Sequence, residues 1–129
     1  MSFEAKSVSI SLTVKDLEVS RKWYVDVLGF TVARKIERDG VLRGYAVTAG
    51  SVRLALNQDD GAKGWDRVKG LGFSFNLTTD QDVDALAASI TAAGGTIATM
   101  PYDAPWGSRV MRLVDPDGYK IAISKPIQK

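Results

Sequence analysis

Two residue types that could do chemistry are missing from this sequence. Its 129 residues include no histidine and no cysteine. Thiolate nucleophiles, imidazole bases, disulfides and the usual zinc ligands are therefore excluded, and any catalysis has to use Asp, Glu, Lys, Tyr, Arg or backbone groups. Asp115 and Asp117 stand close together in a DPDG segment. Because proline and glycine at these positions are typical of a turn, we interpret the segment as a turn and not as an acid–base pair.

The segment PYDAPWGSR contains the first candidate binding residues. Trp106 stands between Pro105 and Gly107, so it is predicted to lie in a loop and not in the core. An aromatic ring in such a loop can stack on a planar ligand; capping of the core and a place in a dimer interface are the alternatives. Arg109 follows the loop, where it either contacts the same ligand or lies on a solvated strand edge.

Polar positions on predicted strands provide the second group of candidates. Residues 7–14 and 72–77 alternate between apolar and polar side chains, which predicts two half-buried strands. The polar positions considered are Ser9, Ser11, Ser74 and Asn76. We expect them on the face turned away from the helices, where they either form hydrogen bonds to a polar ligand or bond only to each other and to water. Arg53 is predicted to point to the same face, where its charge requires either an acidic side chain or an anionic ligand.

The elements that position these residues occur twice. A shift of 65 residues superposes Ser9 on Ser74 and Gly29 on Gly94, and both halves read as strand, helix and three strands. We therefore predict an α+β fold in which two tandem β-α-β-β-β modules form a concave mixed sheet with helices on the convex face. The chain is expected to be a single domain, 1–129. Module one covers about 5–57, a polar linker covers 58–70 and module two covers about 71–125.

These modules resemble the vicinal oxygen chelate superfamily, which includes glyoxalase I, extradiol dioxygenases, and fosfomycin and bleomycin resistance proteins. The runs that carry the resemblance are LTVKDLEVSRKWYVDVLGF, ALAASITAAGG and PWGSRVMRLVDPDGYKIAI. The resemblance implies a divalent metal held at the positions of Ser9, Arg53, Ser74 (or Gly72) and Ala122. Hydroxyl groups, a guanidinium and a methyl group are not a plausible ligand set, so we expect no metal and no cofactor.

The resemblance then favours the branch of the superfamily that binds drugs or metabolites without converting them, usually in cups at a dimer interface. We expect a metal-independent, homodimeric protein of the bleomycin-resistance type that sequesters an antibiotic or metabolite and has no catalytic residue. Its predicted ligand-binding residues are Trp106, Arg53, Ser9, Ser11, Ser74, Asn76 and Arg109. The alternatives are a lyase- or isomerase-type enzyme without the metal site and a fold with an interaction role only.

Charge and hydropathy exclude other classes of partner. The net charge is +2 and no run of five or six like charges occurs, so we expect no nucleic acid. No apolar stretch approaches the roughly 20 residues of a bilayer span, and the N-terminus lacks an apolar signal segment, so we expect no membrane contact and a cytoplasmic location. Trp65, in the polar linker, is predicted to act either as part of a lid or as a contact to a partner subunit.

Overall fold

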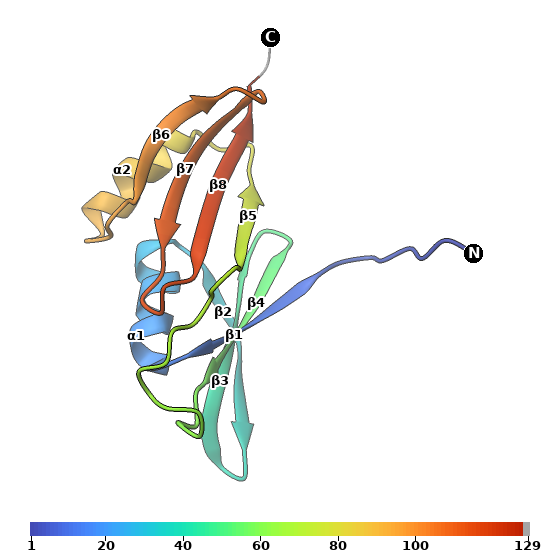
Figure 1. The fold of residues 1–129 in the computed structure, drawn as a ribbon, viewed down its shortest axis with the longest axis vertical. Helices are drawn as coiled ribbons and strands as arrows, with labels where there is room; N and C mark the ends of the chain where they lie inside the picture. Colours follow the sequence, from blue (N-terminus) through green and yellow to red (C-terminus); the bar gives the residue numbers. More distant parts are fainter. Residues whose placement is uncertain (128–129) are drawn as a thin grey trace.

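The computed structural model describes residues 1–127 and consists of two modules placed end to end along the longest axis of the molecule (Figure 1). The first module contains β1 (Ser9–Val14), α1 (Leu17–Lys22), the π-helix η1 (Trp23–Val27), β2 (Thr31–Arg38), β3 (Val41–Ala49) and β4 (Val52–Gln58). The second contains β5 (Ser74–Thr78), α2 (Val83–Ala92), β6 (Thr99–Ala104), β7 (Ser108–Val114) and β8 (Lys120–Pro126). The predicted α+β fold of two β-α-β-β-β modules is confirmed.

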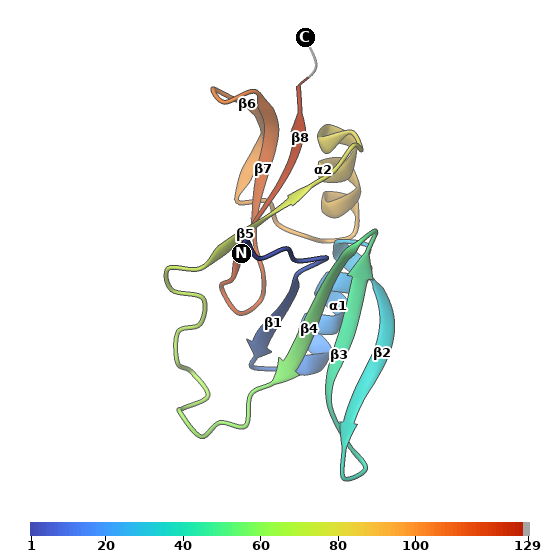
Figure 2. The ribbon, with the colours of Figure 1, turned by 90° about the vertical axis from the view of Figure 1, so that its right-hand side faces the viewer.

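Each module builds its own four-stranded mixed sheet. The strand orders are β1-β4-β3-β2 and β5-β8-β7-β6, so the second sheet repeats the topology of the first. In both sheets the first and last strands of the module pair in parallel, and the other pairs are antiparallel. Both helices lie on the same side of the molecule in Figure 1, and the view in Figure 2 is turned toward the opposite side. One face of each sheet is therefore left without a helix.

Side-chain caps and glycines set the ends of the helices. The Asp16 carboxylate accepts hydrogen bonds from the backbone N–H groups of Glu18 and Val19, which satisfies two free donors at the start of α1. Asp82 caps α2 in the same way. Gly29 follows η1 with a φ of 88°, a conformation that costs a glycine little. Within residues 1–127, neither helix is long and apolar enough to cross a membrane.

Alternation along the strands places the apolar side chains between the sheets and the helices. Leu12 of β1 and Leu54 of β4 are 1% and 0% exposed, and in the second module Met111 and Leu113 of β7 are likewise buried, at 0% and 1%. These residues form one continuous core across both modules. The strand predicted over residues 7–14 begins only at Ser9, and Val8, which precedes it, is 72% exposed.

The DPDG segment forms the predicted turn, and it also joins the two modules. Asp115 accepts a hydrogen bond from the hydroxyl of Tyr24 at 2.7 Å and two more from the backbone N–H groups of Asp117 and Tyr119 at 2.9 and 2.8 Å. Burial of the Asp115 carboxylate nevertheless raises its pKa above the ordinary value of 3.8. Tyr119 in turn donates its hydroxyl to the backbone carbonyl of Thr13 at 2.8 Å. The turn is thus fixed against η1 and the end of β1.

A second close approach between the modules occurs at Gly95, directly after α2. A Cβ atom at this position would lie 2.5 Å from Cγ1 of Val27 in η1 and 2.7 Å from Cγ2 of Ile90 in α2. Any larger side chain would push these residues apart. The glycine that ends α2 therefore also lets the helices of the two modules approach each other.

Candidate binding site on the second sheet

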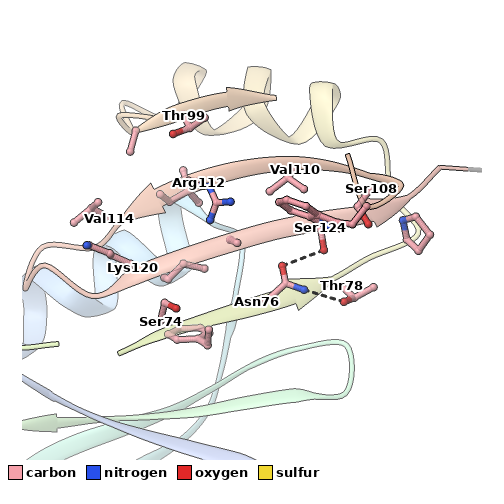
Figure 3. A pocket seen from close by; sticks show the side chains of 17 residues that line it. Ser74, Asn76, Thr78, Thr99, Ser108, Val110, Arg112, Val114, Lys120 and Ser124 are labelled. Carbon is pink, nitrogen blue, oxygen red and sulfur yellow. Dashed lines mark hydrogen bonds between the residues drawn. The ribbon is translucent and has the colours of Figure 1, made fainter. Parts of the chain in front are cut away.

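A cavity of about 810 Å³ lies on the face of the second sheet that carries no helix. Side chains from β5, β6, β7 and β8 line it (Figure 3). The turn between β6 and β7 contributes Trp106 to the lining. Three of the residues predicted from the sequence, Ser74, Asn76 and Trp106, line this cavity together. The volume falls in the range of small-molecule sites.

Strand register arranges the cavity's side chains in rows. Ala122 of β8 stands opposite Arg112 of β7 on one side and opposite Asn76 of β5 on the other. In the next row, Lys120 stands opposite Ser74. Since alternate residues of a strand point to the same face, Lys120, Ala122 and Ser124 all face the cavity. The centre of the cavity floor is therefore a methyl group surrounded by longer polar side chains.

A chain of hydrogen bonds holds the polar floor in place. The hydroxyl of Ser124 donates to Oδ1 of Asn76 at 3.0 Å, and Nδ2 of Asn76 donates to Oγ1 of Thr78 at 3.3 Å (Figure 3). Asn76 keeps one N–H for a ligand, and the hydroxyl of Ser74 stands beside it on β5.

The charged side chains that line the cavity are both cations. Arg112 donates from Nη2 to the hydroxyl of Tyr102 at 3.1 Å, and Lys120 projects from the neighbouring strand (Figure 3). None of the cavity's lining residues is an aspartate or glutamate. Neither Arg112 nor Lys120 takes part in any of the ion pairs formed within residues 1–127.

Trp106 lies at the open end of the cavity and is 65% exposed. It precedes Gly107, whose φ of 92° belongs to the tight turn between β6 and β7. The turn places the indole beyond the last paired residues, Ala104 and Ser108, so the ring is not part of the core. A large apolar ring exposed to water beside a cavity is available for stacking on a ligand.

Arg109 lies outside the cavity and forms ion pairs. Its guanidinium donates to both carboxylate oxygens of Asp84 at 3.0 and 2.8 Å, and to Asp103 at 3.1 Å. The hydrogen bond from Arg109 lowers the pKa of Asp84 below its ordinary value. Because Asp84 belongs to the first turn of α2, Arg109 ties β7 to that helix. A bidentate contact of this kind positions structure and leaves little of the guanidinium for a ligand.

The remaining predicted site residues lie on the first sheet. Ser9 of β1 stands opposite Arg53 of β4, and Ser11 stands opposite Ala55. All of them are on the face away from α1, since the intervening Leu12 and Leu54 are buried beneath that helix. The sequence correctly placed Ser9, Ser11 and Arg53 on the face without a helix. In one chain, however, none of them lines the second sheet's cavity.

Comparison with known proteins matches this arrangement to one family. The model of the glyoxalase/bleomycin resistance protein/dioxygenase superfamily aligns with residues 6–123, which is nearly the whole chain. The chain belongs to this superfamily. A solved structure from Frankia sp. EAN1pec, described as a glyoxylase/bleomycin resistance protein/dioxygenase domain, superposes with a TM-score of 0.80 at 20% identity and covers 98% of this chain and 95% of that one.

Two curated relatives in the superfamily are named as enzymes. The chain is 27% identical to a probable lactoylglutathione lyase of Synechocystis sp., over 92% of this chain and 93% of the relative. It is 29% identical to a lactoylglutathione lyase of Haemophilus influenzae, over 85% of this chain and 84% of the relative.

The superfamily's metal site does not fit the residues of this chain. Of the four implied positions, Ser9 and Arg53 stand side by side on the first sheet, and Ser74 and Ala122 lie on the second. They offer two neutral hydroxyls, a cation and a methyl group, which do not hold a divalent cation. Within residues 1–127, no three His, Cys, Asp or Glu side chains come together in a possible metal site.

Several cavity residues of this superfamily member were not among the predicted site residues. These residues are Lys120, Ser124, Thr78 and Arg112. Lys120 and Ser124 could have been predicted from the sequence, because residues two positions from Ala122 on the same strand share its face. Arg112 could not be assigned to this face without the register that places it opposite Ala122.

Proposed function

We propose that this protein is a metal-independent small-molecule-binding protein of the bleomycin-resistance type, which sequesters an antibiotic or metabolite. The observation that carries the proposal is the 810 Å³ cavity with an exposed tryptophan at its open end. A planar ligand would stack on Trp106, while Asn76 and Ser74 would donate hydrogen bonds to its polar groups. Sequestration needs affinity and no reacting group, which agrees with a site that lacks an acid, a histidine and a cysteine.

A homodimer would complete the site. The cavity is open along one side, and Arg53, Ser9 and Ser11 present a similar polar face on the first sheet of the same chain. In a two-fold dimer, the first sheet of one chain could cover the second sheet of its partner and enclose the ligand. Apolar side chains available for such an interface include Phe3 and Leu71, which are 90% and 83% exposed.

Thermal-shift screening with planar antibiotics and aromatic metabolites tests the proposal. A compound present at about 100 times its dissociation constant should stabilise the folded protein by about 2.7 kcal/mol, which raises the melting temperature measurably. Compounds found in this way should quench the tryptophan fluorescence of the wild-type protein. They should not quench the remaining tryptophan fluorescence of a Trp106→Phe variant. If no compound from a broad planar panel shifts the melting temperature, the binding function is wrong.

The names of the two curated relatives favour one alternative, a lyase of the same fold that acts without the metal. Such an enzyme would need a proton acceptor, and the lining of the cavity offers only the neutral form of Lys120 in that role. An assay decides between a binding protein and a lyase. The protein is incubated with the hemithioacetal of methylglyoxal and glutathione, and the formation of lactoylglutathione is measured. Turnover abolished by Lys120→Gln would establish the enzyme and overturn the binding-only function.

A further inference from the structure

Ala122 forms the bottom of a small socket within the cavity. Its cross-strand neighbours are Arg112 and Asn76, and Lys120 and Ser124 stand two residues away on the same face of β8. Directly opposed residues of an antiparallel pair have Cβ atoms about 5 Å apart. The methyl group of Ala122 therefore leaves space for a small group that the surrounding polar side chains can reach.

The socket has an uncompensated positive charge. Arg112 uses part of its guanidinium on the neutral hydroxyl of Tyr102, and Lys120 forms no ion pair within residues 1–127. The cavity lining contains no carboxylate. Two cations on neighbouring strands of one concave face repel each other, so an anion between them would be bound with charge-assisted hydrogen bonds.

Part of the first sheet's face without a helix also carries positive charge. Two neighbouring rows on this face run from Ser9 through Arg53 to Thr48, and from Ser11 through Ala55 and Ala46 to Arg34. These two rows contain two arginines and no acidic residue, whereas Asp59 and Asp60 lie further along the face, beside Thr13 and Asn57. If the two rows of a second copy covered the cavity, they would therefore add positive charge around a bound molecule.

We propose that the ligand of this cavity is an elongated aromatic acid, whose carboxylate or other oxyanion sits over Ala122 between Arg112 and Lys120 while its ring system stacks on Trp106. This assignment of ligand class depends on the proposed function, since it requires that the cavity binds a small molecule. Ala122 and Pro126 are four residues apart on β8, and Pro126 pairs with Ser108 next to the Trp106 turn. At about 3.3 Å per residue, a ligand that touches both ends is about 13 Å long, which is roughly the length of two linked rings that carry a carboxylate.

Biphenyl-4-carboxylate and biphenyl-4-carboxamide are suitable probes, because they share size and shape and differ in charge. Isothermal titration calorimetry with wild-type protein should give an affinity for the acid at least about tenfold higher than for the amide, as expected for a hydrogen-bonded charge. Equal affinities for the two compounds would overturn the anion assignment and leave the proposed binding function intact. Absence of binding by both would count against both proposals.

Matched variants locate the effect. Arg112→Gln and Lys120→Gln should each reduce the affinity for the acid by about tenfold and leave the affinity for the amide nearly unchanged. Ala122→Glu places a carboxylate in the socket and should abolish the preference for the acid. Lys35→Gln makes the same charge change away from the cavity. Lys35 stands opposite Tyr45 on the edge strand β2 of the first sheet, on the face that carries the helix. This control variant should leave both affinities unchanged. An equal loss in Lys35→Gln would show a general charge effect and would refute the socket.

Discussion

The hydroxyl of Tyr24 donates a hydrogen bond to Oδ2 of Asp115 across 2.7 Å, and these residues are 91 positions apart in the sequence. Tyr24 is 0% exposed and Asp115 is 4% exposed. The pair therefore links α1's module to the last hairpin of the other module inside the common core. The position of β8, and with it the cavity floor at Ala122, depends on this contact.

Replacement of Tyr24 by phenylalanine should destabilise the protein by about 1–3 kcal/mol. The substitution keeps the ring and removes only the hydroxyl, so Oδ2 of Asp115 would remain buried without this donor. Urea denaturation followed by circular dichroism measures the change in the free energy of unfolding. Tyr102→Phe is the matched control, because its hydroxyl bonds to the exposed Arg112, and it should change the free energy by less than about 0.5 kcal/mol. Equal losses in both variants would contradict the special role of the Tyr24 contact.

Replacement of Asp115 by asparagine should change how stability depends on pH. Burial raises the pKa of Asp115 in the folded protein above 3.8, so protonation of this group favours folding. Its favourable contribution is complete below 3.8 and is lost as the pH rises through the raised value. Because asparagine does not titrate, the stability of the variant relative to wild type should increase as the pH is raised from below 3.8 to neutrality. Denaturation curves along this pH series test the sign, and a relative stability that worsens with pH would show that the hydrogen bonds outweigh burial.

Replacement of Trp106 by alanine should weaken the binding of a planar ligand by about tenfold, as expected when one stacking contact of about 1.5 kcal/mol is lost. The free energy of unfolding should change by less than about 0.5 kcal/mol, because the side chain is 65% exposed. Trp65→Ala is the control: Trp65 is also half exposed, but it packs on Gly61 in the linker and does not line the cavity. A loss of affinity in Trp65→Ala as large as in Trp106→Ala would place the ligand elsewhere.

Metal analysis should find no stoichiometric metal in protein purified without chelator. Ser9, Arg53, Ser74 and Ala122 provide no donor set, so treatment with EDTA should leave both the melting temperature and ligand affinity unchanged. Inductively coupled plasma mass spectrometry checks the metal content. The metal-independent function would be overturned if the protein contained stoichiometric zinc, nickel, manganese or iron and if removal of this metal by EDTA abolished ligand binding.

The sequence predicted the fold because its signals are local or repeated. The alternation of apolar and polar side chains in residues 7–14 and 72–77 depends on a few neighbouring residues. The 65-residue repeat then implied that the second half builds the same module as the first. These features gave the face of the sheets on which Ser74 and Asn76 lie.

The rest of the site depends on register and on contacts between distant segments. Arg109 and Arg112 are three residues apart and look alike in the sequence, but one is held by Asp84 and the other faces the cavity. Likewise, the DPDG turn was predicted from its composition, but its partner Tyr24 belongs to the first helical segment of the other module. Only a three-dimensional arrangement relates such residues, because no local pattern encodes which strand stands opposite which.

The separation of the two sheets has a consequence for the order of folding. The longest strand pairings within a module close 44 positions (Ser9 with Arg53, 53 minus 9) and 46 positions (Ser74 with Lys120, 120 minus 74), whereas the Tyr24–Asp115 contact closes 91. Since chain closure becomes more costly with length, each module should assemble first and docking should complete late. Tyr24→Phe should then accelerate unfolding and leave the refolding rate nearly unchanged in stopped-flow measurements. A slower refolding rate would instead mean that the first module recruits the last hairpin while it is still forming.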